Sequence, residues 1–326
     1  KKVIKKLPFI FDSLKKIKNA CEKPEVTELS HFPGICFHIE KDSKGSYILE
    51  CYDDGGIYDE HINAEGIHYP PQVPGNYYAD GYSTLLFLKI YERTKELCWL
   101  EAARKTWEFL NRIYPRYRPS HIAWHHSDFK NAAILEVIHQ FGEKFPEFST
   151  FPHALVEDFY EPTNVFALRC HWKALCHHLQ LSTDKKIETD LARVISDQTA
   201  DGLYHDNIEA YPDAHDLTYH QYSTACLAQA LFYSDSKTLK KSFMQAVRFS
   251  LAVFGPEGEP AYVGRASNNL HQSASCALAF HKAAQITEYK NEREQFLKAA
   301  YLAVKRIRDF QTSNGMVPTG LNPHIK

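Results

Sequence analysis

The feature that most constrains the fold is a recurring glycine turn that separates pairs of helical segments. A polar-Gly-apolar turn occurs at residues 53–59, 200–206 and 313–318, and residues 256–260 occupy a similar place between the last two. The 200–206 and the 313–318 turns each come directly after a Gln-Thr pair. The turns recur at roughly 50 to 60 residues, or multiples of that, with about two helices in each interval. Such a period is typical of stacked αα-hairpins, which either close into a ring or form an open solenoid.

The helical segments are recognised by apolar residues at three- and four-residue intervals. They lie at residues 83–94, 97–113, 130–141, 165–179, 187–198, 223–233, 237–253, 270–287 and 293–311. Strand-like alternation is brief, at residues 35–39 and 46–51, and predicts at most a small β-hairpin. We therefore predict an all-α fold in which residues 1–326 form one domain and residues 1–60 are partly irregular or a hairpin.

Composition limits the classes of partner. Hydrophobic residues make up 44% of the chain, charged residues 24%, and the formal net charge is -2. No global basic field exists to attract nucleic acid or an anionic membrane, so we predict neither as a partner. No apolar run reaches the ~18 residues of a membrane span. An acidic polymer would have to be bound by a local cationic site.

The cysteines give no sign of a metal site. All eight fall at irregular spacings without a CxxC pair, which argues against zinc. Cys98, Cys170, Cys226 and Cys276 lie in helical apolar runs, so we expect mostly buried, free thiols. The chain begins at Lys1, which is compatible with a cleaved signal peptide or with a shortened chain. We favour a secreted or periplasmic location over a cytoplasmic one; nothing predicts an oligomeric state.

A histidine and two tyrosines begin one helix, within residues 216–223, after a Pro/Asp-rich loop. Tyr219 and Tyr222 are i, i+3 neighbours on one helix face, and His220 lies beside that face. Imidazole titrates near neutral pH and a phenol can donate a proton, so the three are candidate acid/base groups. The alternative is a helix start whose aromatic side chains simply pack with their polar tips in water.

An arginine lies at a second junction between a loop and a helix. Gly264 lets the backbone approach a ligand closely, and the guanidinium of Arg265 matches a carboxylate with two parallel hydrogen bonds. Ser267 is a candidate N-cap for the helix that begins near Asn269. The alternative is a surface arginine paired with a carboxylate, which contributes little to stability.

Asn131 lies near the start of a third helix, where its amide can donate to a carboxylate oxygen without adding charge. The alternative is an ordinary exposed helix residue. His125 and His126 are adjacent, and adjacent residues diverge on a helix, so we do not expect them to chelate a metal. Aromatic and polar residues beside these helix starts are candidates for contacts to sugar rings. They are Trp124, His125, His126, Tyr77, Tyr78, Tyr82, Asn268 and Asn269.

These segments together resemble the α/α-toroid polysaccharide lyases, the group that contains alginate, glucuronan and heparinase-type lyases. The resemblance is carried by Tyr-His-Gln-Tyr at residues 219–222, Gly264-Arg265, the Asn131 segment and the glycine turns. The helical pattern covers most of the chain, whereas the specific motifs are short. Two features depart from the group: no segment after residue 311 is typical of the β-sandwich that many such lyases carry, and their Asn-rich motif is not cleanly reproduced.

The resemblance implies an (α/α) toroid or incomplete barrel of about five or six helical hairpins. It also implies β-elimination at a uronic acid residue of an acidic polysaccharide or oligosaccharide. Asn131 and Arg265 would neutralise the substrate carboxylate, which allows the C5 proton to leave. His220 with Tyr222 or Tyr219 would take that proton and protonate the glycosidic oxygen at C4. This chemistry needs neither a metal nor an organic cofactor.

Two other functions fit the same sequence. A glycoside hydrolase on the same toroid, resembling the unsaturated glucuronyl hydrolases, would use carboxylates among Asp80, Asp128, Asp213 and Asp216. A non-enzymatic helical-repeat scaffold would bind partners on its concave face. A lyase creates a C4–C5 double bond that absorbs ultraviolet light, a hydrolase creates reducing ends without it, and a scaffold does neither.

Overall fold

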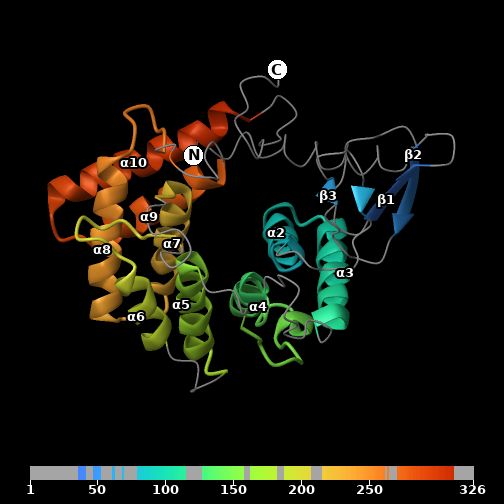
Figure 1. Ribbon diagram of the computed structural model, residues 1–326. Coiled ribbons are helices and arrows are strands. Elements are labelled where there is room, and N and C mark those ends of the chain that lie inside the picture. The colour runs from blue at the N-terminus through green and yellow to red at the C-terminus, as the bar shows by residue number, and fades with distance from the viewer. Residues whose placement is uncertain are drawn as a thin grey trace. The chain divides into compact units, whose positions relative to one another are not determined.

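A computed structural model describes most of the chain from residue 79 onward and short segments before it. The described residues are 36–41, 47–52, 61–62, 68–69, 79–114, 127–157, 162–181, 187–206, 215–260, 263 and 270–311. Helices dominate them (Figure 1). Contacts divide the chain into an N-terminal unit, Phe11–Phe159, and a C-terminal unit, Tyr160–Lys326 with Lys1–Ile10. That residues 1–326 form one domain stays a prediction.

The strands form two small antiparallel pairs. β1 (Cys36–Lys41) pairs with β2 (Tyr47–Tyr52), so the predicted small hairpin is confirmed. β3 (His61–Ile62) and β4 (His68–Tyr69) form a second pair that we did not predict. Two-residue strands are too short to show the alternation of apolar and polar residues on which strand prediction depends.

The helices of the N-terminal unit enclose an aromatic core. The unit contains α2 (Ala79–Thr94), α3 (Leu97–Ile113), α4 (Ser127–Phe141) and the 3-10 helix η3 (Pro146–Phe148). α2 packs against both α3 and α4. The Phe87 and Trp99 rings stack at 5.7 Å between centroids, and Trp107 meets Phe148 edge-on at the same distance. Each such ring removes a large apolar area from water, so these aromatic residues contribute strongly to the stability of the unit.

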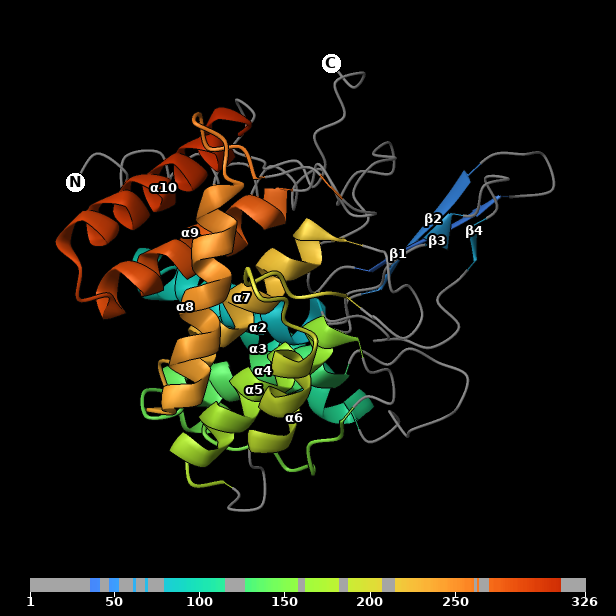
Figure 2. The same ribbon diagram turned by 60° about the vertical axis from the view of Figure 1, so that its left-hand side comes forward.

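The C-terminal unit is a set of helical hairpins in two layers. Its helices are α5 (Thr163–His178), α6 (Glu188–Ser196), α7 (Leu217–Ala230), α8 (Lys237–Ala252), α9 (Leu270–Ile286) and α10 (Lys290–Asp309). α7 packs against both α5 and α9 (Figure 2). Fourteen of the 16 residues of α5 and 11 of the 14 residues of α7 are buried, but only four of the 20 in α10. Helices α5, α7 and α9 are therefore the inner helices of this unit, and α6, α8 and α10 are the outer ones.

The glycine turns recur in three dimensions as well as in sequence. After α6, Gly202 N–H donates to Thr199 O at 3.0 Å, and after α8, Gly258 N–H donates to Gly255 O at 3.0 Å. Both glycines have positive φ, 109° and 93°. A Cβ at Gly202 would overlap the Gln245 carbonyl oxygen of α8, and one at Gly258 would lie 2.6 Å from the carbonyl oxygen of Leu302 in α10. Each turn thus docks against the next outer helix, which confirms the repeat for these two turns; residues 53–59 and 313–318 lie outside the described residues.

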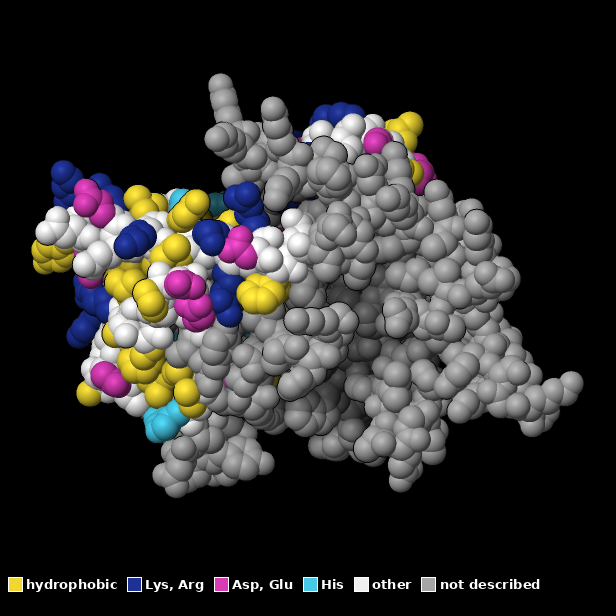
Figure 3. Space-filling model, turned by 90° about the horizontal axis from the view of Figure 1, so that it is seen from above, with side chains coloured by type: hydrophobic (Ala, Val, Ile, Leu, Met, Phe, Trp, Pro, Cys, Tyr) yellow, Lys and Arg dark blue, Asp and Glu magenta, His cyan; other side chains and the backbone are white. Residues whose placement is uncertain are grey.

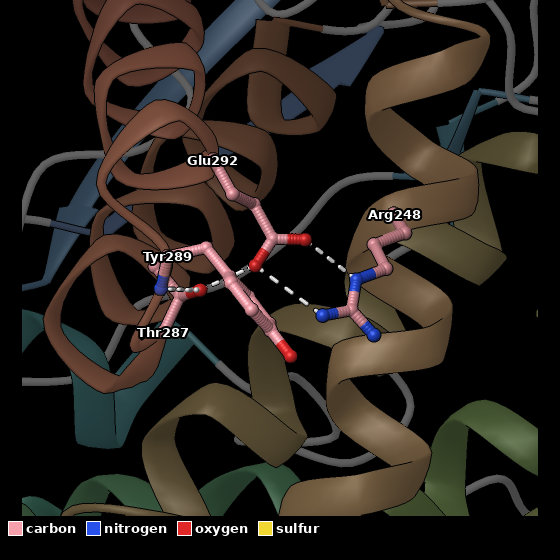
Figure 4. A network of polar contacts seen from close by, with 4 residues as sticks. All are labelled: Arg248, Thr287, Tyr289 and Glu292. Carbon is pink, nitrogen blue, oxygen red and sulfur yellow. Dashed lines mark hydrogen bonds and ion pairs between the residues drawn. The ribbon is translucent and has the colours of Figure 1, made fainter.

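Side chains also connect neighbouring outer helices. Arg248 of α8 donates to Glu292 in the first turn of α10, from Nε to Oε1 at 2.6 Å and from Nη2 to Oε2 at 3.3 Å (Figure 4). Glu292 also accepts from the Thr287 hydroxyl, which in turn accepts from Tyr289 N–H. The Glu292 carboxylate lies near the positive end of the α10 dipole, and this position stabilises the first turn of the helix. Arg248 is about half exposed, so the ion pair contributes at most about 1 kcal/mol.

Each predicted helix is present, but α2, α4, α5 and α10 begin two to four residues earlier than predicted, α7 begins six residues earlier, and the burial of one cysteine is predicted wrongly. α7 begins at Leu217, earlier than the predicted residue 223, because its first turns bury polar rather than apolar side chains. Cys98 is exposed, so its predicted burial is wrong: it is the second residue of α3, on the solvent side of the first turn. The other cysteines whose side chains are described, Cys170, Cys176, Cys226 and Cys276, are buried thiols, as predicted. Among the described residues, no helix combines the length and apolar character that crossing a membrane requires.

We expect Gly202→Ala to lower the free energy of unfolding by roughly 1–3 kcal/mol or more, because the new Cβ meets backbone and the positive φ is unfavourable for alanine. Urea unfolding followed by circular dichroism measures the loss. Gly255→Ala is the matched control, since its Cβ would meet mainly the flexible Glu259 side chain, and the loss should be smaller. Equal stability of Gly202→Ala and the wild type would contradict the docking of this turn on α8.

Candidate functional site

Hydrogen bonds bring the starts of α5, α7 and α9 toward one end of the C-terminal unit. Thr163 Oγ1 at the start of α5 donates to Asp197 Oδ2 at 2.7 Å. The loop that contains Asp197 continues to Tyr204, whose N–H donates to His220 Nδ1 of α7 at 3.0 Å. Leu217 N–H at the start of α7 donates to the carbonyl of Val263, which shortly precedes α9, at 2.9 Å. We refer to the starts of α5, α7 and α9 with the loop 197–206 as the helix-start end.

Asp216 fixes where α7 begins. It is buried and adopts the extended conformation of an N-cap, and its Oδ1 accepts from Thr218 N–H at 3.0 Å and from Tyr219 N–H at 3.2 Å. A carboxylate in this position satisfies N–H groups that the helix itself leaves unpaired. The predicted loop-to-helix junction before Tyr219 is therefore confirmed. Asp216 now has a defined structural role.

His220 is completely buried in the second turn of α7. Its Nδ1 accepts from Tyr204 N–H, so Nε2 carries the hydrogen and donates to Ser250 Oγ of α8 at 3.0 Å. Burial lowers the pKa of His220 to about 3, against the opposing effects of a backbone hydrogen bond with Ala246 and the charge of Asp201. The ring is a neutral link between the loop 197–206, α7 and α8. That His220 removes a substrate proton stays a prediction, and this geometry favours a positioning role instead.

Tyr219 and Tyr222 are both half-buried at the start of α7. The Tyr222 hydroxyl hydrogen-bonds to the sulfur of Cys226, one turn further along the helix. Burial raises the pKa of the Cys226 thiol to about 12, and the hydrogen bond from Tyr222 opposes the rise. The thiol is therefore not a nucleophile at neutral pH. Tyr219 and Tyr222 are the members of the predicted trio that remain partly exposed, whereas His220 is fully buried.

Further imidazoles and a further carboxylate lie at the helix-start end. The His205 and His215 rings lie 4.8 Å apart between centroids, and Asp206, which follows His205 in the chain, is buried. His271 is exposed at the second position of α9; desolvation lowers its pKa, and the charge of Asp216 opposes the shift. Sequence reasoning did not select His205, Asp206 or His271. Their positions in the chain could have identified them: His205 and Asp206 end a recurring glycine turn, and His271 follows the Gly-Arg junction.

Asn131 belongs to the N-terminal unit, where it is completely buried in α4. Its Oδ1 accepts from the Tyr114 hydroxyl at 2.6 Å, and its Nδ2 donates to the Val156 carbonyl at 2.8 Å. Val156 N–H donates to the Tyr114 hydroxyl at 3.0 Å, which closes the network. The alternative of an ordinary exposed residue is therefore wrong. A role in neutralising a carboxylate stays a prediction, and the amide already links two parts of its own unit.

Most of the remaining predicted site residues are not covered by the structure. Tyr82 is half-buried in α2, and Asp128 is buried at the start of α4. The residues that lie outside the described part are Arg265, Asn268, Asn269, Trp124, His125, His126, Tyr77, Tyr78 and Asp213, together with the side chain of Asp80. That Arg265 and Asn131 neutralise one substrate carboxylate together accordingly stays a prediction.

The described residues form no metal cluster, and the coloured part of the face drawn in Figure 3 carries no broad basic patch. Within the described ranges, no three His, Cys, Asp or Glu side chains are placed to hold a metal ion. Figure 3 shows Lys and Arg side chains interspersed with Asp, Glu and hydrophobic ones over the coloured part of that face. An anionic ligand would therefore be attracted by local groups, such as helix starts, rather than by a field that covers the molecule.

Comparison with known proteins identifies the fold. Neither a family model nor a curated protein sequence matches the chain. An unsaturated glucuronyl hydrolase from Bacillus sp. GL1 is similar in structure, with 15% identity, a TM-score of 0.56, and 96% of this chain and 87% of that one covered. A polysaccharide lyase is similar over 78% of this chain and 84% of its own, with 12% identity and a TM-score of 0.54. A cellobiose 2-epimerase from Bacillus thermoamylovorans B4167 covers 94% of this chain and 90% of its own, with 11% identity and a TM-score of 0.55.

The predicted fold class, an all-α protein of the α/α-toroid type, is confirmed by these structures. Their names describe a hydrolase, a lyase and an epimerase. Because one fold carries three reactions, the fold alone does not choose between them.

We expect His220 to make folding stability depend on pH between about 6.5 and 3. Its pKa is ~6.5 in an unfolded chain and about 3 in the folded one, so the unfolded state binds the proton first as the pH falls. This contribution to stability is complete above pH ~6.5 and decreases by about 1.4 kcal/mol for each pH unit below it. Urea unfolding between pH 7 and 4.5 measures the slope.

In His220→Gln that part of the slope should disappear, although the variant is less stable at pH 7. His177→Gln, a change at an exposed position at the end of α5, is the matched control and should leave the slope unchanged. An identical slope in His220→Gln and the wild type would contradict a buried, neutral His220.

Proposed function

We propose that this protein is an enzyme that cleaves a uronate-containing glycan by β-elimination. The observation that carries the proposal is the pair of half-buried phenols, Tyr219 and Tyr222, at an end of the C-terminal unit where three inner helices begin. Support also comes from the fold, which a polysaccharide lyase and an unsaturated glucuronyl hydrolase share. A secreted or periplasmic location is part of the proposal.

The helix-start end suits a ligand that carries negative charge. A helix dipole places partial positive charge at the helix start, and α5, α7 and α9 start there together. α5 has no side-chain cap, whereas the Asp216 carboxylate is committed to the N–H groups of α7. The uronate carboxylate would be held at this end, with Arg265 before α9 as its proposed cationic partner. The same positive potential would stabilise the charge that develops when the C5 proton leaves.

The proton transfers fall to a phenol. His220 is neutral with a pKa of about 3 and has both nitrogens engaged, so it is poorly suited to accept a proton at neutral pH. A tyrosine, whose side chain ordinarily loses its proton near pH ~10, needs a nearby cation to act as a phenolate, and Arg265 is the proposed one. Tyr219 or Tyr222 would then remove the C5 proton and return a proton to the O4 leaving group. His220 would hold the second turn of α7, and thereby both phenols, in place.

A glycoside hydrolase is the second candidate, because the buried carboxylates Asp206 and Asp216 lie at the same end. General acid/base hydrolysis of a glycosidic bond uses such a pair. We favour the lyase because the Asp216 carboxylate already caps α7. A non-enzymatic scaffold would use neither the phenols nor the carboxylates.

We expect Tyr219→Phe or Tyr222→Phe to lower the rate of β-elimination by roughly 10²–10⁴-fold, the usual loss for an acid/base group. The assay is the ultraviolet absorbance of the new C4–C5 double bond on a panel of uronate polymers. Asp216→Asn is the matched control, because asparagine caps a helix as well as aspartate does and only the charge is lost. It should keep the fold and most of the activity.

The hydrolase predicts the reverse ranking. In that case Asp216→Asn or Asp206→Asn abolishes activity, both phenylalanine variants remain active, and reducing ends form without a rise in absorbance. Full activity of both phenylalanine variants would therefore overturn the lyase mechanism. A wild type that cleaves no polymer in the panel, by either assay, would support the scaffold.

A further inference from the structure

Three buried polar side chains at the helix-start end have no role in the reaction proposed above. Asn164 is the second residue of α5, Gln221 is the fifth of α7, and Ser273 is the fourth of α9. Their exposed fractions are 6%, 1% and 1%. The Oδ1 of Asn164, both amide atoms of Gln221 and the Oγ of Ser273 are buried without a hydrogen-bond partner.

Such groups require an explanation, because buried polar atoms in folded proteins almost always form hydrogen bonds. A protein with an unpaired buried polar group is less stable than the same protein with an apolar side chain of the same shape in that place. Here the three occur on three helices that pack side by side, with α7 in contact with both α5 and α9. They also occur within the first two turns of those helices, as Tyr219 and Tyr222 do. One shared ligand at this end would satisfy all of them.

The chemistry of the three groups indicates what that ligand is. None carries a charge, and together they offer amide N–H donors, amide oxygen acceptors and a hydroxyl that does both. Sugar hydroxyls are matching partners, since each donates one hydrogen bond and accepts others. A carboxylate would be a poorer partner, because it only accepts.

We propose that Asn164, Gln221 and Ser273 form a subsite for an uncharged sugar residue, beside the position that binds the uronate. The inference rests on the proposed glycan substrate and adds a specificity to it: the polymer is mixed, with a neutral sugar next to the acidic one. A site built to hydrogen-bond hydroxyl groups rejects analogues that lack them, because its own polar groups are then left unpaired.

The test is Gln221→Met, which keeps the approximate length of the side chain and removes both polar atoms. Thermal unfolding is recorded without sugar, and with cellobiose, lactose, maltose and uronate-containing oligosaccharides. Removal of an unpaired buried amide should raise the Tm of the ligand-free protein by roughly 2–4 °C. The Tm increase that the sugars produce in the wild type should be lost, with affinity reduced at least about tenfold. Ser273→Ala should have the same two effects, to a smaller extent.

Gln198→Met is the matched control. Gln198 donates to the Ser242 carbonyl at 3.0 Å and accepts from Ser242 Oγ at 2.8 Å, so its loss leaves partners unsatisfied. This variant should have a lower Tm and keep the full response to sugars. The subsite is overturned if Gln221→Met loses Tm as Gln198→Met does, if it keeps the full response, or if no sugar in the panel stabilises the wild type.

Failure of the subsite and failure of the proposed lyase give different results. If the response to sugars depends on Gln221 while no polymer yields a double bond, the lyase is wrong and the subsite stands. If double bonds form and Gln221→Met leaves KM unchanged and lowers the Tm, the subsite is wrong and the lyase stands.

Discussion

The burial of the inner helices is the constraint on which the rest of the C-terminal unit depends. α5 and α7 are covered along nearly their whole length, so their side chains reach a ligand only near the helix ends. Every polar group between the ends must find a partner inside the protein. Lys173 of α5 meets this requirement by pairing with Asp190 of α6 at 2.6 Å. The chemistry is therefore concentrated where the helices begin, around Asp216 and the two phenols.

The sequence predicted the helices well for a physical reason. Outer helices such as α6 and α8 have one apolar face toward the protein and one polar face toward water, and this contrast is visible as a periodic pattern. The inner helix α7 lacks the contrast, because polar residues such as His220 and Gln221 are buried in its first turns. The pattern therefore began at residue 223, although the helix begins at Leu217.

The location of the candidate site could be predicted from the sequence, but the role of each residue in it could not. The aromatic segment before residue 223 does lie at a junction of a loop and a helix. That His220 bonds to Tyr204 and Ser250 depends on residues far away in the chain, and no local pattern contains that information. The same holds for Asn131, whose partners Tyr114 and Val156 come from other segments. Residue types indicate which chemistry is available, whereas hydrogen-bond partners decide which groups remain available for it.

The docked glycine turns have a consequence for how the chain assembles during synthesis. Gly202 rests on Gln245 and Gly258 rests on Leu302, so each turn acquires its support only after a later outer helix has been made. During synthesis, the turn after α6 would thus lack its support until α8 has left the ribosome. The turn after α8 would lack its support until α10 has left the ribosome. Neighbouring units in repeat proteins stabilise one another. Each hairpin would therefore become fully ordered only after the next hairpin has been synthesised.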